Sequence, residues 1–146
     1  MYSAPKAARH SYRSILAAAS VLVAAYAGPA ISQEFKIALS GSQEIPPVTT
    51  SATGTGIINV GADKAVRGSV TVSGLSPTAV HIHEAPTGKN GPIIIPLYQT
   101  ADNVWSVPEN AKLTDAQYES FKAGNLYYNV HTVANKGGEI RGQIKP

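Results

Sequence analysis

The chain has 146 residues, 12 Lys and Arg against 9 Asp and Glu, and no cysteine. This length suits one domain, and a chain without cysteine has no disulfide, thiolate metal ligand or cysteine nucleophile. Three basic residues and no acidic ones precede Gly28, so the remainder carries 9 charges of each sign and offers no basic stripe for nucleic acid.

The first segment, residues 1–27, has the three-part pattern of a secretory signal peptide. Three basic residues precede an apolar run that starts at Ile15 and ends in the small-x-small sequence AYA. We expect cleavage after Ala27, or as late as position 32. The run is short for a bilayer span and no second run follows, so we expect a periplasmic or secreted domain without a stable membrane span after signal removal.

The remaining chain, taken as one domain over 34–146, consists of short segments punctuated by glycine and proline. Phe35–Leu39 alternates apolar and polar residues, which predicts a strand with one buried face. Pro46 and Pro47 then end any sheet pairing. Seven further strand-like segments follow, at 55–60, 65–75, 78–84, 91–99, 103–107, 126–133 and 138–144.

One helix is predicted between the last strands, in the sequence LTDAQYESFKAG. Thr114 and Gln117 have the spacing of a capping box, and Gly124 stands where a helix C-terminus is expected. Seven to nine short strands with one short helix predict an all-β fold, an antiparallel Greek-key or immunoglobulin-like sandwich or barrel.

Three histidines stand out in the predicted domain. His81 and His83 are separated by one residue, so they share a face of their strand, and both precede a glycine-rich loop. His131 also lies in a strand that opens onto such a loop. If the two strands are neighbours, three imidazoles converge, which is the minimum for a copper or zinc site with an open position.

Two other interpretations bear on this cluster. The histidines could instead hydrogen-bond to loop carbonyls and hold the loops EAPTGKNG and TVANKGG in place. In a metal site, Glu139 is a candidate supporting residue, since it begins the strand after ANKGG and a carboxylate commonly holds the far nitrogen of a ligand histidine.

Three stretches in order, LSGSQEIPPVTTSATGTG, AVHIHEAPTGKNGPIIIPL and GNLYYNVHTVANKGGEIRGQI, closely resemble the CHRD domain, which is named from chordin and widespread in exported bacterial proteins. The resemblance covers nearly all of Phe35 to Ile144. It implies an immunoglobulin-like antiparallel barrel or sandwich and, since chordin is an extracellular binding protein, a binding role without a generally accepted catalytic activity.

The chain departs from the usual family pattern at Glu84, where a small residue or glycine is common after the His-x-His pair. The resulting sequence HIHE is similar to a strand of copper-zinc superoxide dismutases, but their disulfide and bridging histidine have no counterpart here, so the likeness is a distant analogy.

Two functions therefore remain open. The first is an exported binding or interaction module with an unknown extracellular or periplasmic partner and a copper or zinc ion at His81, His83 and His131. The second is a small copper-dependent redox enzyme. We expect the binding module rather than the enzyme, and the two differ in turnover of superoxide or peroxide.

The signal-peptide hypothesis makes a direct prediction. Protein recovered from the periplasm or medium should lack the apolar run and begin near Gly28 or Gln33, as N-terminal sequencing would show. An intact Met1 on protein in a membrane fraction would contradict it and indicate a tethered protein.

Overall fold

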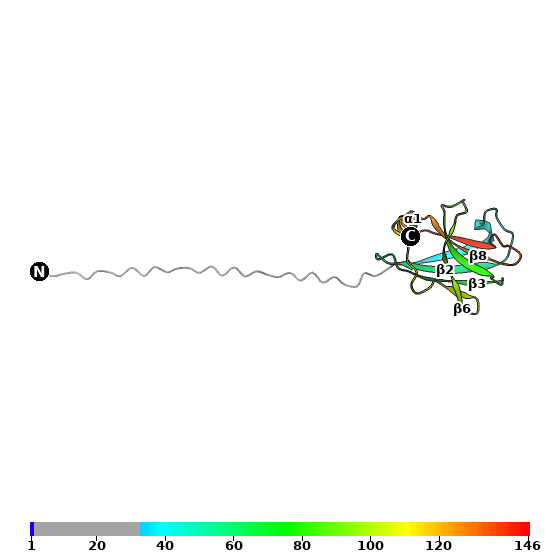
Figure 1. Ribbon diagram of the computed structural model, residues 1–146, viewed down its shortest axis with the longest axis horizontal. Helices are drawn as coiled ribbons and strands as arrows, with labels where there is room; N and C mark the ends of the chain where they lie inside the picture. Colours follow the sequence, from blue (N-terminus) through cyan, green and yellow to red (C-terminus); the bar gives the residue numbers. More distant parts are fainter. Residues whose placement is uncertain (2–32) are drawn as a thin grey trace. The chain divides into compact units, whose positions relative to one another are not determined.

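The computed structural model describes Met1 and residues 33–146, and Figure 1 draws the remainder as a thin trace. The signal peptide predicted for residues 1–27 lies outside the described residues. Among those described, no helix is long and apolar enough to cross a membrane.

Nine strands, one α-helix and one short 3-10 helix make up the described part of the chain. The elements are β1 (Glu34–Ser40), η1 (Gly41–Gln43), β2 (Thr53–Val60), β3 (Val66–Ser73), β4 (Ala79–Glu84), β5 (Ile93–Pro96), β6 (Tyr98–Ala101), β7 (Val104–Ser106), α1 (Asp115–Lys122), β8 (Leu126–His131) and β9 (Ile140–Ile144). Every predicted strand is present. The run at 91–99 divides into β5 and the start of β6, because the chain changes its pairing partner there from β4 to β7.

The two end strands of the sheet follow each other directly along the chain. The order across the sheet is β5-β4-β8-β9-β1-β2-β3-β7-β6, and all neighbouring pairs are antiparallel. Only Leu97 separates β5 from β6, and its N–H donates to the Val80 carbonyl at 2.9 Å. One segment thus pairs at both ends of the sheet and curls it into a nearly closed barrel (Figure 1), which confirms the predicted all-β antiparallel fold.

Strands β4, β8 and β9 have two different faces. Their inward side chains belong to the apolar core and are almost fully buried: Val80, Ile82, Leu126, Tyr128, Val130, Ile140 and Ile144. Their outward side chains are polar or aromatic: His81, His83, Tyr127, Asn129, His131, Arg141 and Gln143. Side chains alternate along a strand, so the residues between the core positions must face away from the core, where three loops cover them.

Hydrogen bonds connect this outward face to the covering loops. Arg141 donates to the carbonyl of Lys89 at 2.8 Å, which holds the loop between β4 and β5. The backbone N–H of Gln143 donates to the Gln43 side chain at 3.3 Å, which holds the segment after β1. The outward face is therefore a polar layer between the barrel and its loops.

Helix α1 has the capping interactions that its sequence predicts. The Thr114 hydroxyl accepts from the Gln117 N–H at 3.2 Å, and the Gln117 side chain accepts from the Thr114 N–H at 2.9 Å. At the other end Gly124 has φ +75°, a left-handed conformation that glycine adopts without steric cost. Phe121 anchors the helix by an edge-on contact with Phe35, with ring centroids 6.1 Å apart.

The cap predicts a measurable loss of stability. Thr114→Ala removes the hydroxyl acceptor and should lower the free energy of unfolding by about 1 kcal/mol in denaturant melts. Thr87→Ala, in an exposed loop, is the matched control and should change little. Equal stability of Thr114→Ala and the parent would show that the cap contributes nothing.

Candidate metal centre

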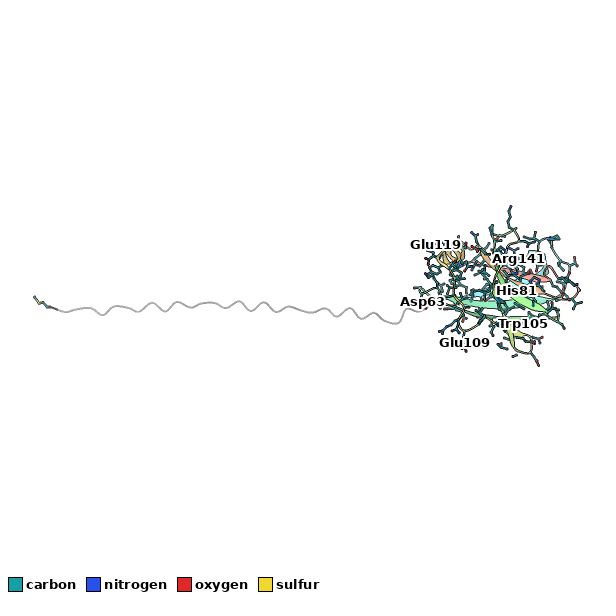
Figure 2. The ribbon with its side chains drawn as sticks, viewed as in Figure 1. Asp63, His81, Trp105, Glu109, Glu119 and Arg141 are labelled. Atoms are coloured by element: carbon teal, nitrogen blue, oxygen red, sulfur yellow. The ribbon has the colours of Figure 1, made fainter. Side chains whose placement is uncertain are left out.

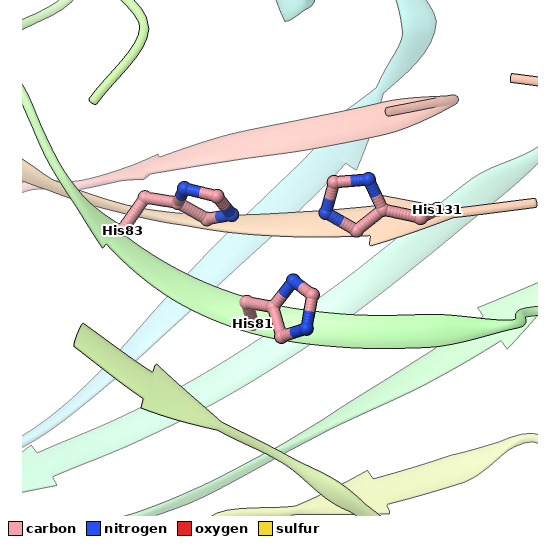
Figure 3. Close-up of side chains that lie close together, drawn as sticks. All are labelled: His81, His83 and His131. Atoms are coloured by element: carbon pink, nitrogen blue, oxygen red, sulfur yellow. The ribbon is translucent and has the colours of Figure 1, made fainter. Parts of the chain in front are cut away.

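The three histidines lie together because β4 and β8 are neighbours in the sheet. The antiparallel register pairs Ala79 with His131 and His81 with Asn129, so all three imidazoles stand on one outward face. Ring centroids are 4.9 Å apart for His81 and His131, 5.6 Å for His81 and His83, and 5.8 Å for His83 and His131. The predicted convergence is confirmed, and Figure 3 shows one nitrogen of each ring turned toward the others.

The spacing of the ring nitrogens suits a single ion. One nitrogen from each histidine lies within 4.8 Å of the other two. Three such points share a position no more than about 2.8 Å from each, which is 4.8 Å divided by √3, whereas zinc–nitrogen bonds are about 2.0–2.1 Å. Movements of less than 1 Å, about the difference between these two lengths, would bring all three nitrogens to bonding distance.

Main-chain carbonyls fix the tautomers of two of the rings. Nδ1 of His83 lies 2.9 Å from the Gly91 carbonyl, and Nδ1 of His131 lies 2.9 Å from the Lys136 carbonyl. A carbonyl only accepts, so each Nδ1 carries the proton and each Nε2 keeps its lone pair. The two interpretations of the sequence are therefore compatible: one nitrogen holds a loop, and the other is left with the electron pair that a metal requires.

The nitrogens on the inner side of the cluster have no hydrogen-bond partner. They are Nδ1 of His81 and Nε2 of His83 and His131, each buried within the described part of the protein. A buried nitrogen without a partner costs about 1–3 kcal/mol, and such groups are uncommon in folded proteins. Three of them in one cluster require an explanation beyond holding loops.

The environment favours the neutral form of two of the three imidazoles, those of His81 and His83. Burial, with a smaller contribution from His131 and His83, lowers the pKa of His81 to about 4. Burial also lowers the pKa of His83, against the opposing effect of its hydrogen bond to Gly91. Neutral imidazoles are the form that coordinates metals, so proton competition at these two rings is weak near neutral pH.

Glu139 lies beside the cluster but binds hydroxyl groups. Its carboxylate accepts from Thr132 at 2.7 Å and from Thr50 at 2.9 Å, and chiefly the hydrogen bond from Thr132 lowers its pKa, against the opposing effect of burial. The far nitrogens of His83 and His131, for which the sequence suggested a carboxylate, are held by main-chain carbonyls instead.

A stack of side chains supports His83 from behind. Tyr127 is parallel to the His83 ring within 13°, with centroids 4.9 Å apart. The Arg141 guanidinium carbon lies 3.5 Å from the Tyr127 ring centroid, a cation–π contact. The Tyr127 hydroxyl also accepts from the Gly91 N–H at 3.1 Å, so the same loop residue is held by both aromatic rings.

A buried carboxyl group lies in the same polar layer. Glu44 is 5% exposed and accepts a hydrogen bond from Asn129, which pairs with His81 on one side and Arg141 on the other. Gly138 makes room for this contact, since a Cβ there would lie 2.6 Å from a Glu44 carboxylate oxygen. Burial raises the pKa of Glu44 to about 7, against the opposing effects of Asn129 and Arg141.

Sequence reasoning did not find Tyr127, Arg141 or Glu44 as part of this site. For Tyr127 and Arg141 the strand alternation indicates an outward position on the side of the histidines. Tyr127 alternates with core residues on the His131 strand, and Arg141 lies between Ile140 and Gly142. Glu44 lies in an irregular loop, where no periodicity indicates which side chains turn inward.

These observations define a small antiparallel β-barrel with a polar layer and a three-histidine cluster on its outer face. A family model for the CHRD domain matches residues 35–144. The chain therefore belongs to the CHRD domain family, as the resemblance of its three motifs predicted. Searches of curated proteins and of solved structures return no match.

The raised pKa of Glu44 predicts how stability depends on pH. The folded protein favours the protonated carboxyl, so this stabilisation is complete below the ordinary value of 4.5 and is lost as pH rises through about 7. Relative to Glu44→Gln, the parent should lose free energy of unfolding between about pH 5 and about pH 8. Glu109 has an exposed carboxylate elsewhere on the barrel (Figure 2), so Glu109→Gln is the control. A constant difference between parent and Glu44→Gln across this range would contradict the assignment.

Proposed function

We propose that this CHRD domain is a non-catalytic binding module that holds one copper or zinc ion through His81, His83 and His131. The observation that carries the proposal is the convergence of three buried ring nitrogens that have no hydrogen-bond partner. A bound cation would satisfy all three at once, while the carbonyls of Gly91 and Lys136 hold two of the rings from behind.

The proposed site leaves a coordination position for a further ligand. Three protein ligands and one open position are typical of catalytic zinc sites, so the ligand set alone does not decide between binding and catalysis. The membership of the CHRD family favours the interaction module. Turnover of superoxide or peroxide by copper-loaded protein would instead favour the redox enzyme that the sequence raises as an alternative.

We also propose that the domain works in the periplasm or outside the cell. The support is the sequence pattern of residues 1–27. A module of this kind would meet its partner after export, where it could hold or deliver the ion.

A pair of substitutions at His83 separates metal binding from loop support. In asparagine, the side-chain amide occupies the place of Nδ1, so His83→Asn can still donate to the Gly91 carbonyl but has no counterpart of Nε2. His83→Ala loses both groups. We expect His83→Asn to keep the stability of the metal-free parent while losing metal affinity, and His83→Ala to lose affinity and about 1 kcal/mol of stability.

Calorimetric titration of metal-free protein with copper(II) and with zinc measures the affinity, and thermal melts measure the stability. The parent should bind one ion and gain about 2.7 kcal/mol of stability at a free-ion concentration 100 times the Kd. Lys89→Ala, in the loop that His83 supports, should bind like the parent. A parent that shows neither binding heat nor a shift in melting temperature with copper(II), with zinc or with copper(I) would exclude the metal site and leave the histidines as loop supports.

A further inference from the structure

We propose that the three-histidine site selects monovalent copper, Cu(I), over divalent ions, and that Arg141 is the residue that determines this selectivity. The inference rests on the proposed metal-binding function and adds the charge state of the ion. It follows from a buried cation beside the site, from the neutrality of the ligands and from the number of donors.

Arg141 keeps its positive charge beside the site. It is 1% exposed, and its hydrogen-bond acceptors are all formally neutral. They are the carbonyls of Lys89 and Pro86 and the side-chain oxygens of Asn90 and Gln143. Within residues 33–146, Arg141 takes part in no ion pair, so no directly bonded carboxylate cancels its field at the cluster.

Two stacked contacts bring this charge close to His83. The Arg141 guanidinium carbon is 3.5 Å from the Tyr127 ring centroid, which is 4.9 Å from the His83 ring centroid. The guanidinium is therefore no more than 8.4 Å, the sum of these distances, from the His83 ring. Figure 2 shows Arg141 and His81 on the same part of the barrel, in agreement with their shared pairing partner Asn129.

The ligands themselves bring no negative charge. The cluster of potential metal ligands consists of three histidines, and among the described residues no carboxylate or thiolate joins it. With neutral imidazoles a bound Cu(I) leaves a charge of +1, and a bound divalent ion leaves +2. Repulsion from Arg141 is thus twice as large for the divalent ion.

The difference in repulsion between Arg141 and the two kinds of ion is large enough to measure as a difference in affinity. At about 10 Å and an effective dielectric constant of about 20, the extra repulsion corresponds to a factor of about 10–20 in affinity. The exposed lysines of the loops contribute less, because solvent and salt screen them. The number of donors acts in the same direction, since Cu(I) is stable with the three protein ligands alone, whereas zinc requires a further ligand such as water at the open position.

Substitutions at Arg141 test the charge separately from the packing. The dissociation constant for Cu(I) is measured in the absence of oxygen, by competition with a chromogenic Cu(I) chelator, and the dissociation constant for zinc is measured separately. Their quotient is the selectivity ratio of each variant. In Arg141→Gln the preference for Cu(I) over zinc should fall about 10- to 20-fold. Arg141→Lys keeps the charge and should keep the ratio, even if both affinities change. Arg67→Gln removes a charge from β3, four strands from β8 in the sheet order, and should leave the ratio unchanged.

Glu44→Gln provides a test that leaves Arg141 in place. Glu44 attracts Arg141 electrostatically, and its substitution by the neutral amide makes the surroundings more positive. Measured at about pH 8, where the carboxyl is ionised in the parent, this change should shift the ratio further toward Cu(I). A loss of packing alone gives no reason for the affinity ratio to shift toward Cu(I). This variant decides the question if Arg141→Gln does not fold.

The outcomes are distinct. A parent that binds neither ion contradicts the metal-binding function itself. A parent that binds ions with a ratio unaffected by Arg141→Gln, or with equal weakening of both ions that Arg141→Lys does not rescue, contradicts the selectivity proposal alone. If Arg141→Gln cannot be measured, an unchanged ratio or a shift toward zinc in Glu44→Gln contradicts it.

Discussion

The antiparallel register of β4 against β8 is the constraint on which the candidate site depends. It places His131 opposite Ala79, two residues before His81 on β4, and turns all three imidazole rings to the outer face of the barrel. Because strand side chains alternate, a slip by one residue would turn the imidazoles into the core and expose apolar residues such as Val80 and Ile82. Burial of the core therefore fixes the geometry of the cluster.

The polar layer outside the barrel does two things at once. Its side chains hold the loops by hydrogen bonds to main-chain carbonyls, and these bonds orient the imidazole rings and set their tautomers. The cost of burying polar groups is thereby offset for Arg141 and Asn129, whose hydrogen bonds are made within the layer. The inner nitrogens of the three histidines are the exception, and that exception is what distinguishes a candidate metal centre from a set of loop supports.

Local patterns in the sequence predict the elements and the faces well. Alternation identifies the strands and the shared face of His81 and His83, and the spacing of Thr114 and Gln117 identifies the helix start. These features depend on residues near one another in the chain. The pairing of β4 with β8 does not, because three strands and a helix lie between them in sequence, so convergence of the histidines could only be a conditional prediction.

Tertiary contacts also explain what the sequence did not indicate. An arginine on the outward side of a strand is normally expected at the surface, yet Arg141 is buried because the loop between β4 and β5 folds over it. Glu44 is buried against Asn129, a contact that spans 85 positions of the sequence. The support of His83 by Gly91 rather than by Glu139 depends on the path of the loop backbone, which residue types alone do not specify.

X-ray absorption spectroscopy on metal-loaded protein tests the central claim most directly, because it counts the donors around the ion. Coordination by three imidazole nitrogens at about 2.0–2.1 Å is the result that the structure predicts. A shell of oxygen donors, or of a single imidazole, would show that the ion binds elsewhere and that the three histidines do not form a metal centre.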